Sequence, residues 1–297
     1  MYGVKTLYEP ESLQKALEVL SHDDEAKIIA GGTDLLLKMR NKGLRDVSLL
    51  SLHRIRELKR IEELPDGTLQ IGALCTFTQV NQSSLVRDKL LFLAEAAVTM
   101  GGPQIQNVAT IGGNLCNGAV SADSAPSLFA LEAQLVLVSS EGTREIPIEE
   151  FYLGPSKVDL KNNEILTAIK IPLFRQNNWG GFYYKYSMRR AMDISTLGCA
   201  AICQVKEDGQ IAQARIALGT AAPTPFRCRK AEELAVNQCL SPQLLVRIGE
   251  AAAGEANPRS SWRASREFRL ELIKELTART LVQAYQNAGG EYRDEED

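Results

Sequence analysis

Two glycine-rich turns are the segments of this chain whose residue types and spacing could bind a phosphate group. The first is Ala30-Gly31-Gly32-Thr33-Asp34, and the second is Ala109-Thr110-Ile111-Gly112-Gly113-Asn114. Glycine has no Cβ, so a diphosphate can approach the backbone closely at these positions, where small polar side chains add hydrogen-bonding groups. Together the two turns predict a cradle for a phosphate-bearing cofactor.

The first turn lies between an expected strand and an expected helix. The apolar run 26–29 predicts a buried strand, and residues 35–40 predict a helix with an apolar face. The unpaired N–H groups and the positive dipole end of such a helix favour a negative charge. Taken alone, the turn also fits an ordinary connection in which Thr33 or Asp34 caps the helix.

The second turn favours phosphate binding over that simpler alternative. It is followed, up to Pro126, by small and hydroxylated residues with no amphipathic period. We therefore expect irregular backbone here, with little side chain to bury and many main-chain groups that need partners.

Other common site signatures are absent from the sequence. There is no G-x-G-x-x-G, and the run from Gly113 to Gly118 has Walker spacing but is followed by Ala119 instead of lysine. His22 and His53 are the only histidines, which argues against a histidine metal site or a Ser-His-Asp triad. The pair Cys199 and Cys203 is expected to be buried instead of metal-bound.

Composition predicts a globular protein of two or three structural units. The 297 residues are 44% hydrophobic, and 34 basic against 37 acidic residues give a net charge of −3, which does not indicate nucleic-acid binding. Six scattered cysteines without a C-x-x-C pair, and no signal-peptide pattern, predict a cytoplasmic protein with reduced thiols. No apolar run approaches the roughly 18 to 20 residues that cross a bilayer.

Periodicity and turn signals predict the elements around the two turns. In the first half we expect helices over 9–20, 78–89 and 91–100, and strands over 47–50, 69–73 and 134–138. Residues 164–172 alternate like an edge strand that ends at Pro172, and the polar residues 175–178 predict a linker at a domain boundary.

The second half has the pattern of an antiparallel sheet covered by helices. The expected strands are 181–188, 198–205 and 211–219, and the expected helices are 231–234, 242–254 and 265–286. The charged end, residues 291–297, is expected to fray.

Several of these segments resemble one known family in combination. They are Ile29 to Leu36, Ala109 to Asn114 with Asp123 beyond it, Glu164 to Leu166, Tyr184 to Ser195, and Arg259 to Ser265. Over nearly its whole length the chain resembles the FAD-binding medium subunits of molybdenum hydroxylases. It is most similar to the FAD subunits of bacterial xanthine dehydrogenases, with nicotinate dehydrogenase close by.

The resemblance implies an α+β fold with two domains. Residues 1–175 would form a two-part FAD-binding domain of the vanillyl-alcohol oxidase (PCMH) type, with subdomains of about 1–57 and 58–175. Residues 176–290 would form a smaller C-terminal domain of the CO dehydrogenase flavoprotein type, with an antiparallel sheet and helices.

The resemblance also implies a set of FAD-binding residues. The pyrophosphate would lie over the first turn, and residues of the second turn with Asp123 would extend the contacts toward the ribityl chain and adenosine. The full set is Ile29, Ala30, Gly31, Gly32, Thr33, Asp34, Leu35, Leu36, Gly101, Ala109, Thr110, Gly112, Gly113, Asn114, Asp123, Leu166 and Lys185. No protein residue would be catalytic, because the flavin performs the redox step. Lys185 and Arg190 are either electrostatic tuners of the flavin or solvated surface cations.

Three departures from the family pattern bear on the flavin. Met100 stands where several relatives carry an aromatic residue, which implies a ring that is less tightly stacked or faced differently. Ala191 and Met192 stand where animal xanthine dehydrogenases carry acidic residues, so the electrostatics and the preferred acceptor are expected to differ. The insertion that holds an extra iron–sulfur cluster in one branch is absent, since no suitable cysteine group lies between Cys116 and Cys199.

As such a subunit, the chain would receive electrons from a molybdenum cofactor and two [2Fe–2S] clusters on partner chains. Its flavin would pass them to NAD(P)+ or another acceptor. Two alternatives stay open. One is a flavin-binding scaffold that transfers no electrons, and the other is a stand-alone flavoenzyme, which the scarcity of histidine disfavours. The sequence leaves open the substrate (xanthine, another purine or nicotinate), the acceptor and the stoichiometry.

Overall fold

The computed structural model describes residues 3–174 and 178–292. Within these ranges the buried apolar side chains form three clusters, around Leu20, Phe129 and Ile216. The expected domain boundary at residue 175, most of the expected linker, and most of the expected charged tail lie outside the described residues. That boundary therefore stays a prediction.

The N-terminal unit is a small parallel sheet with two helices. Its strands are β1 (Val4–Tyr8), β2 (Lys27–Ile29) and β3 (Val47–Ser51) in the order β1-β3-β2, and its helices are α1 (Leu13–His22) and α2 (Leu35–Lys42). Helix α1 begins later than expected, because the Ser12 side chain accepts a hydrogen bond from the Lys15 N–H and caps it. Helix α2 ends at Gly43, which has φ +61°.

The central unit is built on an antiparallel sheet in the order β4-β5-β10-β6-β7. These strands are β4 (Ile61–Glu63), β5 (Thr68–Gly72), β10 (Ile165–Pro172), β6 (Gln134–Ser139) and β7 (Gly142–Pro147), preceded by the 3-10 helix η1 (Arg56–Lys59). The prediction of an edge strand over 164–172 is wrong, because β10 lies between β5 and β6. Pro172 is the last residue of the strand, so its missing N–H interrupts none of the pairing within it.

Short helices cover the central sheet. They are α3 (Phe77–Gln82), α4 (Ser84–Lys89), α5 (Leu91–Val98), α6 (Pro103–Gln106), α7 (Ile111–Cys116), α8 (Ala125–Ala130) and α9 (Ile148–Phe151), followed by the hairpin β8 (Tyr152–Gly154) and β9 (Lys157–Val158). The single helix expected over 78–89 is broken at Ser83, whose hydroxyl accepts from the Val86 N–H and starts α4. The irregular backbone expected after the second turn is partly helical, since α7 and α8 lie there.

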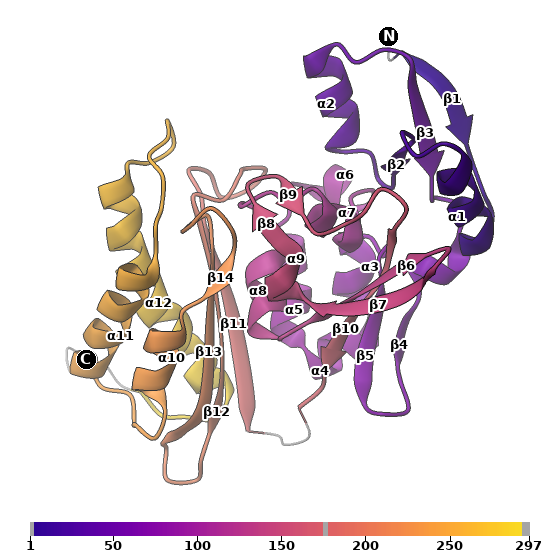
Figure 1. The fold of residues 1–297 in the computed structure, drawn as a ribbon. Helices are drawn as coiled ribbons and strands as arrows, with labels where there is room; N and C mark the ends of the chain where they lie inside the picture. Colours follow the sequence, from indigo (N-terminus) through magenta and orange to yellow (C-terminus); the bar gives the residue numbers. More distant parts are fainter. Residues whose placement is uncertain (1–2, 175–177, 293–297) are drawn as a thin grey trace.

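The C-terminal unit is an antiparallel sheet packed against helices, as the sequence pattern predicted. The strand order is β11 (Trp179–Tyr186), β12 (Leu197–Val205), β13 (Ile211–Gly219) and β14 (Phe226–Arg227). Its helices are α10 (Arg229–Ala235), α11 (Pro242–Glu255) and α12 (Arg266–Asn287). Figure 1 shows these helices on the outer face of the sheet, while α8 and α5 of the central unit contact the other face.

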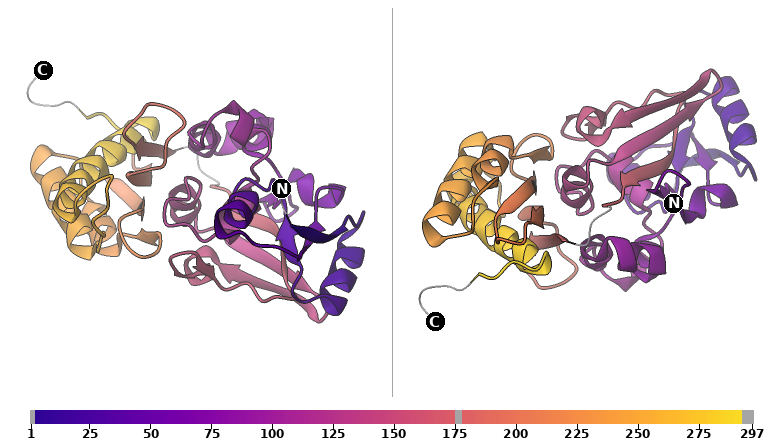
Figure 2. Two further views of the ribbon diagram at one scale, coloured as in Figure 1. Left: turned by 90° about the horizontal axis from the view of Figure 1, so that it is seen from above. Right: turned by 90° about the horizontal axis from the view of Figure 1, so that it is seen from below.

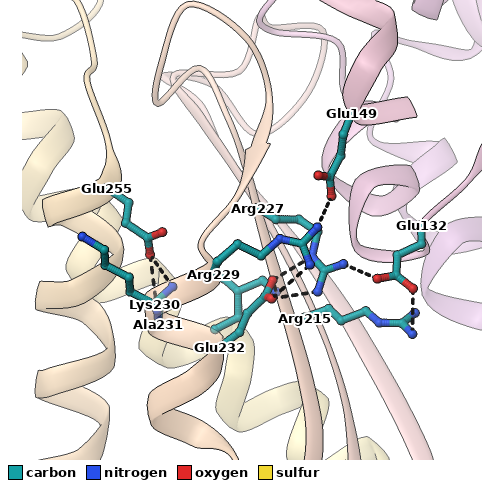
Figure 3. A network of polar contacts seen from close by, with 10 residues as sticks. Glu132, Glu149, Arg215, Arg227, Arg229, Lys230, Ala231, Glu232 and Glu255 are labelled. Carbon is teal, nitrogen blue, oxygen red and sulfur yellow. Dashed lines mark hydrogen bonds and ion pairs between the residues drawn. The ribbon is translucent and has the colours of Figure 1, made fainter. Parts of the chain in front are cut away.

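The central unit contacts the other two units. The views in Figure 2 agree that the C-terminal unit, coloured orange to yellow, occupies one end of the molecule. An ion network joins it to the central unit: Glu132 accepts hydrogen bonds or ion pairs from Arg215 and Arg227, and Glu149 accepts from Arg229 (Figure 3). Among residues 3–174 and 178–292, no helix is long and apolar enough to span a membrane.

Candidate functional site

A cavity of about 680 Å³ opens where the three units meet. The N-terminal unit contributes the turn between β2 and α2, and the central unit contributes the start of α7. The C-terminal unit contributes Arg189, residues 192–194 and residues 262–263. Its volume is within the range of ligand and cofactor pockets in proteins. The cavity is therefore the candidate functional site.

The two glycine turns contact each other in one wall of this cavity. A Cβ at Gly31 would lie 1.9 Å from the backbone oxygen of Val108, so only glycine allows this approach. On the other side of the contact, a Cβ at Gly113 would lie 3.9 Å from the Ala30 Cβ. The Lys38 ammonium on α2 also donates to the Asn117 side chain at the end of α7. Two segments far apart in the sequence thus form one continuous surface.

The first turn presents free backbone donors. The N–H groups of Gly31, Gly32, Thr33 and Asp34 have no hydrogen-bond acceptor within the described part of the chain. Gly32 has φ +72°, and Asp34 precedes α2 without capping it through its side chain. Four free amides at the N-terminus of a helix are a suitable environment for a diphosphate.

The second turn has a different role from the one the sequence suggested. Its amides are already bonded within the protein: Ile111 N–H donates to the Cys75 carbonyl, Gly112 N–H to the Ala73 carbonyl, and Gly113 N–H to the Thr110 hydroxyl. Gly112 packs against Ala73, where a Cβ would approach to 2.6 Å. The turn therefore holds the first turn in place and offers little free backbone of its own.

The structure brings most of the expected site residues together. Thirteen of the seventeen line the cavity: Ile29, Ala30, Gly31, Gly32, Thr33, Asp34, Leu35, Gly101, Ala109, Thr110, Gly113, Asn114 and Asp123. The other four, Leu36, Gly112, Leu166 and Lys185, are not among the lining residues. Leu166 is buried in β10 with 4% of its surface exposed, and the Leu36 side chain packs beside Gly32.

Lys185 does not line the cavity but forms an ion pair with Asp123, which does. Its ammonium lies 2.7 Å from an Asp123 carboxylate oxygen and also donates to the Thr99 carbonyl, and both charged side chains are less than 10% exposed. The Tyr183 hydroxyl donates to the other carboxylate oxygen at 3.4 Å. Burial raises the pKa of the Asp123 carboxyl, while the Lys185 ammonium opposes this shift. The alternative of Lys185 as a solvated surface cation does not fit this geometry.

The sequence prediction missed part of the wall that the C-terminal unit provides. Arg189, Trp262 and Arg263 line the cavity, whereas Arg190, which we expected near the flavin, lines a neighbouring cavity of about 480 Å³. Asn117 and Ser121 were also missed. The only sequence signal for Trp262 and Arg263 was their place in a segment that resembles the family.

Comparison with known families agrees with this architecture. Residues 3–174 match the family described as the FAD binding domain in molybdopterin dehydrogenase, and residues 182–284 match the CO dehydrogenase flavoprotein C-terminal domain. The fold and cavity thus define an FAD-binding oxidoreductase subunit, and FAD is its cofactor.

Individual relatives cover the chain almost completely. The xanthine dehydrogenase FAD-binding subunit of Escherichia coli O157:H7 is 43% identical over 98% of this chain and 99% of its own length. The carbon monoxide dehydrogenase medium chain of Hydrogenophaga pseudoflava is 29% identical over 94% of this chain and 96% of its own length. A solved structure of carbon monoxide dehydrogenase from Hydrogenophaga pseudoflava superposes with a TM-score of 0.91, at 29% identity, over 97% of this chain and 99% of that chain.

The chain therefore belongs to the family of FAD-binding subunits of molybdopterin dehydrogenases, the molybdenum hydroxylases. The predicted α+β fold, with a PCMH-type FAD domain and a C-terminal part of antiparallel sheet and helices, is confirmed.

Proposed function

We propose that this chain carries FAD between iron–sulfur clusters of a partner subunit and an electron acceptor, in a xanthine dehydrogenase-like complex. In this complex a separate subunit with a molybdenum cofactor would hydroxylate xanthine or another purine. The observation that carries the proposal is the row of free amides in the first turn, which opens into a cavity large enough for a cofactor. The acceptor would be NAD(P)+ or another oxidant.

The residues present fit FAD at this cavity. The amides of residues 31–34 would hold the pyrophosphate, because they are free, adjacent and at a helix N-terminus. The side-chain Oδ1 of Asn114 already accepts from the Ser124 hydroxyl at 2.7 Å, which leaves the side-chain NH2 of Asn114 to donate toward the ligand. The buried Asp123 carboxylate would accept from ligand hydroxyls, and Lys185 would position it.

The bound flavin would supply the redox chemistry, accepting two electrons and giving them to the acceptor. The protein's residues would bind and orient the cofactor and exclude water from it. We propose no catalytic side chain in this subunit.

The identity values favour a purine dehydrogenase within the family. The chain is 43% identical to the xanthine dehydrogenase subunit and 29% identical to the carbon monoxide dehydrogenase medium chain, with nearly complete coverage in both cases. We further propose a cytoplasmic location, which the absence of disulfides among the six cysteines supports.

The test is anaerobic flavin reduction in the complex that co-purifies with this chain. Xanthine, hypoxanthine or nicotinate is added, and the visible absorbance of the flavin is followed. Bleaching by a purine supports the proposal. Bleaching by nicotinate alone would show that the complex is a nicotinate dehydrogenase instead of a purine dehydrogenase. Bound flavin that no substrate reduces would contradict the electron-transfer role and favour the scaffold alternative.

A further inference from the structure

The C-terminal unit places an exposed aromatic ring at the rim of the cavity. The Trp262 indole is 76% exposed, although tryptophan is usually covered in folded proteins. It lines the cavity, and the Arg263 guanidinium carbon lies 4.2 Å from the centre of its ring. This stacked pair offers a flat apolar face and a positive charge side by side.

The cations around this pair form no ion pair within the described residues. Among the described residues, no carboxylate lies within ion-pair distance of Arg259, Arg263 or Arg269. The Nε atoms of Arg263 and Arg269 are buried and have no hydrogen-bond partner in the part of the chain that the structure describes. Burial, together with repulsion from Arg259 and Arg263, lowers the pKa of the Arg269 guanidinium. Three guanidinium groups in one place favour an anionic ligand.

The acidic groups that face this cluster are already engaged. The Asp193 carboxylate, on the same cavity wall, accepts from the backbone N–H groups of Arg189 and Ile194 and forms an ion pair with the Arg189 guanidinium. Asp193 also interacts electrostatically with Arg263, and this interaction helps to lower the pKa of the carboxyl. One carboxylate beside Arg189, Arg259, Arg263 and Arg269 leaves the cluster with an excess of positive charge.

The turn that fits the FAD pyrophosphate belongs to a different unit. Its free amides lie between β2 and α2 in the N-terminal unit, whereas Trp262 and Arg263 lie between α11 and α12 in the C-terminal unit. The cavity thus has groups that can bind phosphate on two of its walls: free amides on one and guanidinium groups on the other.

We propose that Trp262 and Arg263 bind the electron acceptor, as a dinucleotide whose base or nicotinamide ring stacks on the indole and whose phosphate contacts the guanidinium. Arg259 and Arg269 add positive charge behind this pair. The inference rests on the proposed function, since it assigns a site to the acceptor that the flavin would reduce.

The test is a binding measurement on the FAD-loaded protein with its co-purifying partners. The variants are Trp262→Ala, Trp262→Phe and Arg263→Ala, and the matched control is Arg266→Ala, an exposed arginine nearby that does not line the cavity. The dissociation constants of NAD+ and NADP+ are measured by calorimetry, and bound FAD is measured from its absorbance.

We expect both alanine variants to weaken dinucleotide binding by about tenfold or more, the size of effect found when a base loses an aromatic stacking partner or a charged hydrogen bond. Trp262→Phe should recover part of the affinity, and Arg266→Ala should behave as the wild type. The FAD content should fall much less than the dinucleotide affinity, because the free amides of the first turn are intact in every variant.

Three results would overturn the inference. They are a loss of FAD in parallel with the dinucleotide, unchanged dinucleotide affinity in both alanine variants, and a wild-type protein that binds neither dinucleotide. Each is distinguishable from failure of the proposed function, which is read from flavin reduction by substrate and needs no dinucleotide.

Discussion

At the residue scale, the cavity depends on a close backbone contact that only glycine permits. Gly31 touches the Val108 carbonyl, and this contact holds the four free amides next to the start of α7. Since the neighbouring atom is backbone, it cannot move aside in the way a flexible side chain can.

We predict that Gly31→Ala lowers FAD content severely. The new methyl group would overlap the Val108 oxygen, so the two turns must separate and the amides must move. The measurement is the ratio of flavin to protein after purification, together with the thermal unfolding temperature. Gly254→Ala is a matched control, because a Cβ there meets nothing within 4 Å; in a helix it should stabilise the protein by about 0.5 to 1 kcal/mol. Equal FAD content in the two variants would show that the contact is not needed.

At the element scale, the beginning of β10 is fixed by an ion cluster around Glu164, the one buried carboxylate in it. The Arg144 guanidinium on β7 donates to both Glu164 carboxylate oxygens, at 2.7 and 2.8 Å, and to Asp159. These bonds from Arg144 are the largest cause that lowers the pKa of Glu164, and the Lys161 N–H adds to the effect. The cluster ties β7 to the loop that precedes the central strand of the sheet.

We predict that Glu164→Gln destabilises the protein by about 1.5 to 3 kcal/mol near neutral pH, the usual value of a hydrogen bond to a charged group. A carboxyl whose pKa is lowered by folding stabilises the protein above its unfolded pKa, and this contribution disappears as the pH falls through the folded pKa. The difference in free energy of unfolding between wild type and variant should therefore shrink in acid. Urea unfolding at about pH 7 and in mild acid measures it, and a difference that does not change with pH would contradict the assignment.

Most elements could be predicted from the sequence because they depend on local patterns. The strand predicted over 26–29, the turn at Gly32 and the alternation of the C-terminal strands are local signals, and the structure has them. The first of these strands is β2 (Lys27–Ile29), which is only half-buried instead of buried as predicted. The position of β10 at the centre of its sheet could not be predicted, since it depends on pairing with β5 and β6, which lie far away in the sequence.

The same limit applies to the site. The glycines and small polar residues of the first turn are enough to predict a phosphate site there. The amides at the start of α7 are bonded to the carbonyls of Ala73 and Cys75, and no local sequence pattern links these two residues to α7. Trp262 joins the cavity only because the C-terminal unit packs beside the central one.

At the scale of the whole molecule, the cavity exists only while the units stay docked. The C-terminal wall is held partly by the network in Figure 3, in which the half-exposed Glu132 bridges Arg215 and Arg227. Both arginines are largely buried, and burial lowers the pKa of Arg215. Glu132 itself has φ +53°, a conformation that non-glycine residues seldom adopt, so its place in the network compensates for local strain.

We predict that Glu132→Ala destabilises the docked molecule by about 1.5 to 3 kcal/mol, because Arg215 loses its carboxylate and Arg227 keeps only Glu232. FAD should dissociate faster, since the wall with Trp262 is held less firmly. The matched control is Glu149→Ala, which removes an exposed pair with Arg229 between the same units and should cost at most about 1 kcal/mol. Thermal unfolding and the rate of flavin release measure both effects. If the two variants release FAD at the wild-type rate, the ion network does not support the cavity, and its wall is held by apolar packing of α5 and α8 against the C-terminal sheet.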